Sequence, residues 1–136
     1  MSLDRIRLAS LHDKVMSAEQ AATFIQDGMT VGMSGFTRAG EAKAVPLALV
    51  KQAKANPLKI TLITGASLGN DLDKQLTEAG VLARRLPFQV DNTLRKAINN
   101  GEVMFIDQHL SETVEQMRNL QLKKPDIAII EAIAIT

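Results

Sequence analysis

The sequence has 136 residues, a formal net charge of +1 and 46% hydrophobic residues, which is the composition of one globular domain with a sizeable core. It has no Cys, Trp or Tyr and only four Phe, which excludes disulfides, thiolate metal sites and a cysteine nucleophile and argues against an aromatic surface for nucleic acid. No apolar run approaches the about 18 residues that a membrane span needs. The N-terminus carries Asp4, Arg5 and Arg7, whereas a secretion signal would be apolar there. We therefore expect a cytoplasmic protein that binds neither membrane nor nucleic acid.

Along the chain, short β-branched runs alternate with helical patterns. Ser17 and Gln20 form a capping box at the start of a helix that we expect to end at Asp27–Gly28. The expected strands cover residues 30–33, 60–64, 81–84, 103–106 and 127–135. The expected later helices cover residues 43–55, 71–79, 92–99 and 111–120, the last of them capped by Ser111. Because every gap between strands has room for a helical crossover, we predict one α/β domain over residues 1–136, with a mostly parallel five-stranded sheet and helices on both faces.

The loops after the first two strands, residues 34–40 and 65–69, are rich in glycine. Ligands of open parallel sheets bind beyond the carboxyl ends of the strands, so these loops are the first candidates for a site. Neither loop carries the dinucleotide fingerprint or the phosphate-binding P-loop. Backbone amides without side-chain bulk could receive a thioester, carboxylate or phosphate. A tight strand-to-helix turn without a ligand is the alternative.

The second loop matches G-x-S-x-G, the nucleophile elbow of α/β hydrolases, with Ser67 at its centre. Asp107 and His109 follow in the order that a catalytic triad needs. These two residues are very close in sequence, and no later segment supplies a histidine. A serine hydrolase, a substrate-contacting Ser67 and a structural Ser67 therefore stay open, and a noncatalytic α/β interaction module is a further alternative.

Charged residues elsewhere carry weaker signals. Glu131 falls inside the last apolar run, where we expect a buried carboxylate with a structural partner. Three short basic pairs are expected to be solvated, although one of them could receive an anionic ligand. These pairs are Arg84–Arg85, Arg95–Lys96 and Lys123–Lys124.

Residues 27–40 resemble the N-terminal signature of coenzyme A transferases, an Asp-Gly followed by a Gly-Phe and a further Gly. The family often has Pro where this chain has Ala42. The resemblance continues through further blocks over nearly the whole chain and is strongest to the succinyl-CoA:acetate CoA-transferase branch of the acetyl-CoA hydrolase/transferase family. These blocks are residues 43–49, 62–67, 84–88, 94–99, 105–111 and 127–132.

The resemblance implies an enzyme of two related α/β halves, commonly a homodimer, in which a glutamate of the second half carries coenzyme A as a thioester. This chain would be the N-terminal part, because its last expected strand runs into Thr136 and no segment matches the surroundings of that glutamate. The resemblance thus implies no catalytic residue here, no metal site and no tightly bound cofactor, with coenzyme A as a substrate. Acyl-CoA, a small carboxylate and the protein's own C-terminal half are the implied partners. The implied substrate-binding residues are Gly35, Phe36, Thr37, Gly65 and Ser67, whereas Val90 stands where relatives often have a polar residue.

Overall fold

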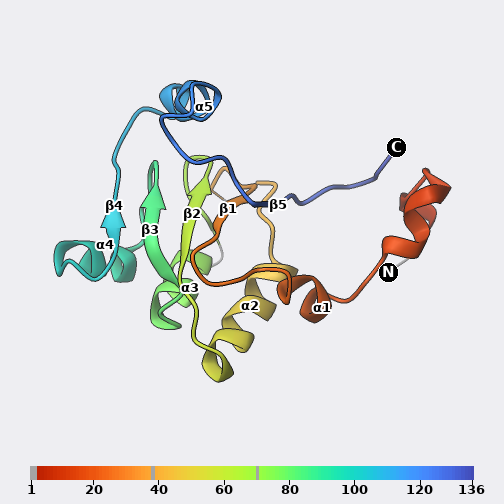
Figure 1. The fold of residues 1–136 in the computed structure, drawn as a ribbon, viewed down its shortest axis with the longest axis horizontal. Helices are drawn as coiled ribbons and strands as arrows, with labels where there is room; N and C mark the ends of the chain where they lie inside the picture. Colours follow the sequence, from red (N-terminus) through yellow and green to blue (C-terminus); the bar gives the residue numbers. More distant parts are fainter. Residues whose placement is uncertain (1–2, 38, 70) are drawn as a thin grey trace.

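A computed structural model describes residues 3–37, 39–69 and 71–136 of the chain. Its centre is a five-stranded parallel sheet in the order β4-β3-β2-β1-β5 (Figure 1). The strands are β1 (Thr30–Met33), β2 (Ile60–Thr64), β3 (Leu82–Leu86), β4 (Met104–Phe105) and β5 (Ile127–Ile129). The helices are α1 (Ala18–Ala22), α2 (Ala44–Ala55), α3 (Leu72–Glu78), α4 (Asn92–Asn99) and α5 (Leu110–Arg118), and short 3-10 helices cover Leu3–Arg5 and Ala9–Lys14. The predicted parallel α/β fold is confirmed.

The order of the strands explains how the helices are distributed. From β1 to β4 each new strand is added on the same side, so right-handed crossovers place α2, α3 and α4 over one face of the sheet. The connection through α5 returns in the opposite direction to β5 at the other side of β1. The core lies under α1 to α4, where Val31, Leu62 and Leu82 pack against helix residues such as Leu49 and Leu76.

Several predicted boundaries differ from the structure, and two helix boundaries do so because a contact made by the folded chain overrides a local signal. The first helix ends at Ala22, because Asp27 and Gly28 bond instead to Lys59, the residue before β2. The Lys59 N–H donates to Asp27 Oδ1 at 2.7 Å. Helix α5 is capped by His109, whose ring nitrogen accepts from the Ser111 N–H at 3.4 Å. The predicted cap, Ser111, lies inside the helix.

The last strand is much shorter than predicted. β5 pairs only with β1, whose residues Val31 to Met33 provide partners for Ile127 to Ile129 and no further. Glu131 therefore lies beyond the strand, and the prediction that it is buried is wrong. Its side chain is 43% exposed and forms an ion pair with Lys43 at 3.1 Å.

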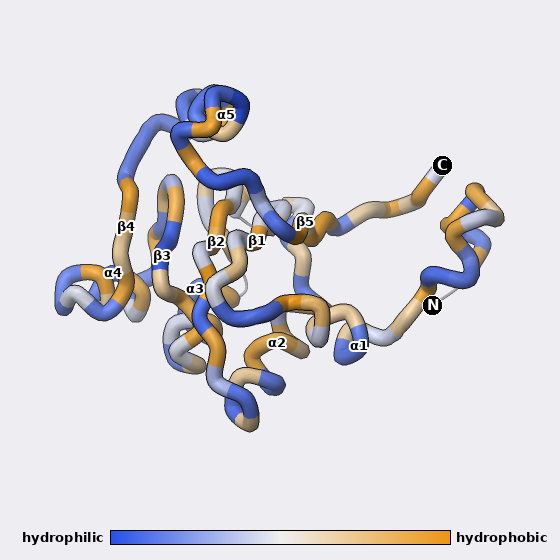
Figure 2. Tube along the Cα trace, viewed as in Figure 1, coloured by the Kyte–Doolittle hydropathy of each residue, from blue (hydrophilic) through white to orange (hydrophobic). Residues whose placement is uncertain are grey.

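Both described ends of the chain lie at the same side of the molecule (Figure 1). Ile6 and Ile135 are joined as a short parallel bridge, in which the Arg7 N–H donates to the Ile135 carbonyl at 2.8 Å. Hydrophobic residues continue along the extended run from β5 to the C-terminus (Figure 2). Among the described residues no helix has the length and hydrophobicity to cross a membrane.

Candidate functional site

The loops that follow β1 and β2 pack directly against each other at the carboxyl ends of the strands. The Thr37 N–H donates to the Ser67 carbonyl at 3.2 Å, and Thr37 and Leu68 form a parallel bridge. A Cβ added at Gly65 would lie 2.4 Å from the carbonyl oxygen of Gly35, a distance that a side chain cannot adopt. Glycine at position 65 therefore allows the two backbones to approach this closely.

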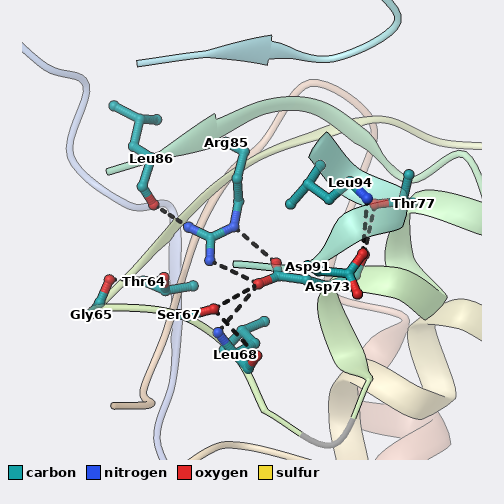
Figure 3. Close-up of polar contacts among 10 residues, drawn as sticks. All are labelled: Thr64, Gly65, Ser67, Leu68, Asp73, Thr77, Arg85, Leu86, Asp91 and Leu94. Atoms are coloured by element: carbon teal, nitrogen blue, oxygen red, sulfur yellow. Dashed lines mark hydrogen bonds and ion pairs between the residues drawn. The ribbon is translucent and has the colours of Figure 1, made fainter. Parts of the chain in front are cut away.

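Ser67 lies on a buried polar network that links the second loop to α3 and β3 (Figure 3). Its Oγ is 3.4 Å from Asp73 Oδ2, which also accepts from the Leu68 N–H at 3.3 Å. Arg85 donates to both oxygens of Asp73, from Nε at 2.9 Å and from Nη2 at 3.2 Å. Its Nη1 donates to the Leu86 carbonyl. Because Ser67, Asp73 and Arg85 are all at most 1% exposed, every charge in this network is paired away from water.

A β-bulge explains why one arginine of a sequential pair is buried. Leu82 pairs with Ile60, but the next pair joins Arg84 to Thr61, so Ala83 is an extra residue in β3. This shift puts Arg85 beside Leu62 on the face covered by helices and turns Arg84 to the opposite face. The expectation that both arginines are solvated is therefore wrong for Arg85.

A pocket of about 280 Å³ lies beside this network. It is lined by residues of both loops and by the starts of α3 and α4, namely Thr37, Ser67, Leu68, Gly69, Asp71, Asp73, Val90, Asp91 and Asn92. Asp73 is neutralised by Arg85, and Asp91 caps α4 by accepting from the Leu94 N–H at 2.8 Å. None of these lining side chains is cationic.

The five residues implied as substrate-binding take different positions. Thr37 and Ser67 line the pocket, whereas Gly35 and Gly65 form the close backbone contact behind it. Phe36 is 63% exposed and is absent from the lining. The aspartates of the pocket were missed by sequence reasoning. Two of them could have been found from the sequence, because Asp71 and Asp91 stand at the starts of the helices that follow β2 and β3, at the same edge of the sheet as the loops.

The geometry does not assemble a serine triad among the described residues. The Ser67 hydroxyl faces Asp73 and the Leu68 carbonyl, and no histidine contacts it. The His109 ring instead bonds to the Ser111 hydroxyl at 2.7 Å at the start of α5. The serine-hydrolase alternative is therefore not favoured.

Comparisons with known proteins agree on one family. The family model described as the acetyl-CoA hydrolase/transferase N-terminal domain matches residues 2–136. A succinyl-CoA:acetate CoA-transferase of Clostridium kluyveri is 45% identical, over 97% of this chain and 25% of that protein. An acetyl-CoA hydrolase of Kluyveromyces lactis is 38% identical, over 97% of this chain and 27% of that protein. The chain thus spans about a quarter of the length of the curated relatives that it matches.

A comparison with solved structures supports the fold. The crystal structure of an acyl-CoA transferase from Escherichia coli O157:H7, in a thioester complex with CoA, matches with a TM-score of 0.64 over 76% of this chain and 23% of that one. Its sequence identity of 19% supports a common fold only.

Proposed function

Because the chain belongs to the acetyl-CoA hydrolase/transferase family, whose N-terminal domain it matches over residues 2–136, we propose that it is the N-terminal domain of a longer enzyme. That enzyme transfers coenzyme A between an acyl group and a small carboxylic acid such as acetate or succinate. Relatives that match nearly all of this chain are named as a CoA-transferase and as acetyl-CoA hydrolases, which supports this reaction class. Coenzyme A is a substrate in this proposal.

The observation that carries the proposal is the meeting of Thr37 and Ser67 at the pocket beyond the strand ends. In a parallel α/β sheet this edge is where substrates bind. Here the domain supplies one wall of the acyl and carboxylate pocket. The Ser67 hydroxyl is a donor that can turn from Asp73 to a carboxylate oxygen of the substrate, while Asp73 keeps its bonds to Arg85 and to the Leu68 N–H.

The proposed chemistry is covalent catalysis by a glutamate outside this chain. That carboxylate attacks the acyl-CoA carbonyl and releases the CoA thiolate, which leaves a mixed anhydride. The thiolate then attacks the glutamyl carbonyl, giving a glutamyl-CoA thioester and releasing the first acid. An incoming carboxylate attacks the thioester and runs the same steps in reverse. Water in place of this acid makes the enzyme a hydrolase, so excluding water from the pocket favours transfer.

The charge of the pocket indicates what the remaining part of the enzyme must supply. Acyl-CoA and the acid are both anionic, but among the residues that the structure describes the lining contains Asp71, Asp73 and Asp91 and no cationic side chain. Arg85 neutralises only Asp73. We therefore propose that the C-terminal half of the longer protein contributes positive charge and oxyanion donors opposite Ser67. A homodimer in the cytoplasm is the proposed state of that longer protein.

The experiment compares this chain with the longer protein that contains it. Both are assayed with acetyl-CoA and succinyl-CoA, with and without acceptor acid, and are then analysed by mass spectrometry for covalent adducts. We expect turnover and a glutamyl-CoA adduct in the longer protein, and no turnover by the 136-residue chain. Turnover by this chain alone would contradict the placement of the nucleophile. Absence of turnover in the longer protein with every acid would contradict the function itself.

A further inference from the structure

A second, smaller cavity lies on the face of the sheet opposite the core. It has a volume of about 140 Å³ and is lined by Gly28, Thr30, Thr61, Ile63, Arg84, Leu86, Leu122 and Lys123. The strand register explains this lining, because Thr30, Thr61 and Arg84 stand side by side on β1, β2 and β3. The chain after α5 covers the row with Leu122 and Lys123. Arg84 and Lys123, one residue from each of two basic pairs that are far apart in the sequence, thus meet at one cavity.

Arg84 brings an uncompensated charge to this cavity. It forms no ion pair with any described residue, and its Nε is buried without a hydrogen-bond partner. Among the described residues, the one hydrogen bond of its guanidinium is a weak one, from Nη2 to the Met104 sulfur at 3.9 Å. A buried guanidinium N–H without an acceptor is unfavourable, so the cavity favours an occupant that can accept hydrogen bonds.

The other polar groups are also donors. The hydroxyls of Thr30 and Thr61 bond to no other described side chain or backbone group, and both residues line the cavity. Lys123 is held by Asp126, with Nζ 2.7 Å from Oδ2. That bond and the Thr30 N–H hold the pKa of Asp126 below its ordinary value, so its carboxylate stays ionised at neutral pH. Two cationic side chains against one carboxylate leave a positive local charge.

We propose that this cavity binds a small oxyanion, a phosphate or a carboxylate group, through the Arg84 guanidinium and the hydroxyls of Thr30 and Thr61. A guanidinium presents paired N–H donors that match two oxygens of such a group. At about 30 Å³ per water molecule, the 140 Å³ cavity holds the volume of a few waters, which suits a phosphate or an acetate but not a nucleotide. The bulge at Ala83 is what turns Arg84 to this face, away from the face that carries Arg85.

The test is a titration followed by ¹⁵N–¹H NMR, which needs no turnover and is therefore independent of the proposed function. Inorganic phosphate and acetate are added separately to the 136-residue chain, with sodium chloride at equal ionic strength as the reference. We expect saturable shifts of the Thr30 and Thr61 amides and of the Arg84 Nε–H. Saturation by phosphate alone, or by acetate alone, identifies the anion. Shifts that never saturate with either, or that chloride reproduces, would overturn the proposal.

Variants assign the binding to the named groups. Arg84→Gln removes the charge and the guanidinium and should weaken anion binding roughly tenfold or more. Arg84→Lys keeps the charge, so its affinity should lie between those of Arg84→Gln and the unchanged chain. Asp126→Asn keeps an acceptor for the Thr30 N–H but frees the Lys123 charge, so it should tighten binding. Arg95→Gln removes one exposed charge from α4 and should leave the affinity unchanged. Equal affinities of Arg84→Gln and Arg95→Gln, in variants whose spectra show the native fold, would refute the site.

Discussion

Ser67 is the single residue on which the two enzymatic interpretations differ most. As a nucleophile it would be indispensable, whereas as a donor to a substrate carboxylate it contributes one hydrogen bond. Its present bonds are long, 3.4 Å to Asp73 and to the Leu68 carbonyl, so the hydroxyl can leave them for a substrate at little cost. We therefore propose the second role for Ser67.

In the longer enzyme, Ser67→Ala should lower kcat/KM for the acceptor acid by roughly tenfold to a hundredfold, because one hydrogen bond to a charged group is lost. The loss for acyl-CoA should be smaller. The measurement is kcat/KM for each substrate, with Ser111→Ala on the exposed start of α5 as the matched control. A loss beyond about four orders of magnitude, or an adduct on Ser67, would restore the serine nucleophile.

Between elements, the Asp73–Arg85 pair joins α3 to β3 from inside the domain. Removing one partner leaves the other charge buried and unpaired, so Arg85→Met should lower the free energy of unfolding by about 3–5 kcal/mol. Adding Asp73→Leu should recover part of this loss, since neither charge then remains. Urea denaturation measures both values.

The exposed Arg118–Glu115 pair of α5 provides the control for this experiment. Its 2.7 Å bond lies in water, so Arg118→Met should change the free energy of unfolding by at most about 1 kcal/mol. Similar effects of Arg85→Met and Arg118→Met would mean that the buried pair does not connect the elements as described.

The contact between the two glycine-containing loops gives a second prediction at this scale. Gly65→Ala would place a Cβ 2.4 Å from the Gly35 oxygen and should cost about 1–3 kcal/mol of stability by forcing the loops apart. Gly32→Ala is the control, because its Cβ would meet Pro125 at an ordinary 3.4 Å. Thermal denaturation of the two variants compares them. A neutral Gly65→Ala would show that the loops are not in close contact.

At the scale of the whole molecule, an apolar surface beside β5 is exposed. A groove of about 540 Å³ is lined by residues of α1, α2 and β5, with Phe24 59% exposed. Ile130 and Ile133, just beyond the strand, are 72% and 85% exposed. The outer edge of β5 pairs with no described strand, so its backbone groups and this surface are both open to another chain.

The isolated chain should therefore self-associate as its concentration rises, with a second copy covering this surface. Sedimentation velocity over a concentration series measures the association. Phe24→Lys and Ile130→Lys should each weaken it, whereas Leu120→Lys, which replaces another exposed apolar residue at the end of α5, should not. A monomer at every concentration would show that the exposed surface does not mediate self-association.

The sequence by itself determined the order and type of the main helices and strands, and it indicated the loops in which we place the candidate site. β-branched runs, capping residues and glycine-rich loops are local signals, so β1, β2 and α4 were predicted with their observed bounds. Parallel strands place their carboxyl ends at one edge, which is why the loops around Gly35 and Ser67 could be expected to meet.

Only the tertiary structure decided which side chains face each other. One extra residue at Ala83 reverses the faces of Arg84 and Arg85, and no local pattern marks that bulge. β5 ends at Ile129 because β1 offers no pairing partner beyond Met33. Asp27 and Gly28 form hydrogen bonds with Lys59 and so do not extend the first helix. Each of these outcomes depends on a partner far along the chain, since register and long-range hydrogen bonds are properties of two segments together and cannot be read from either alone.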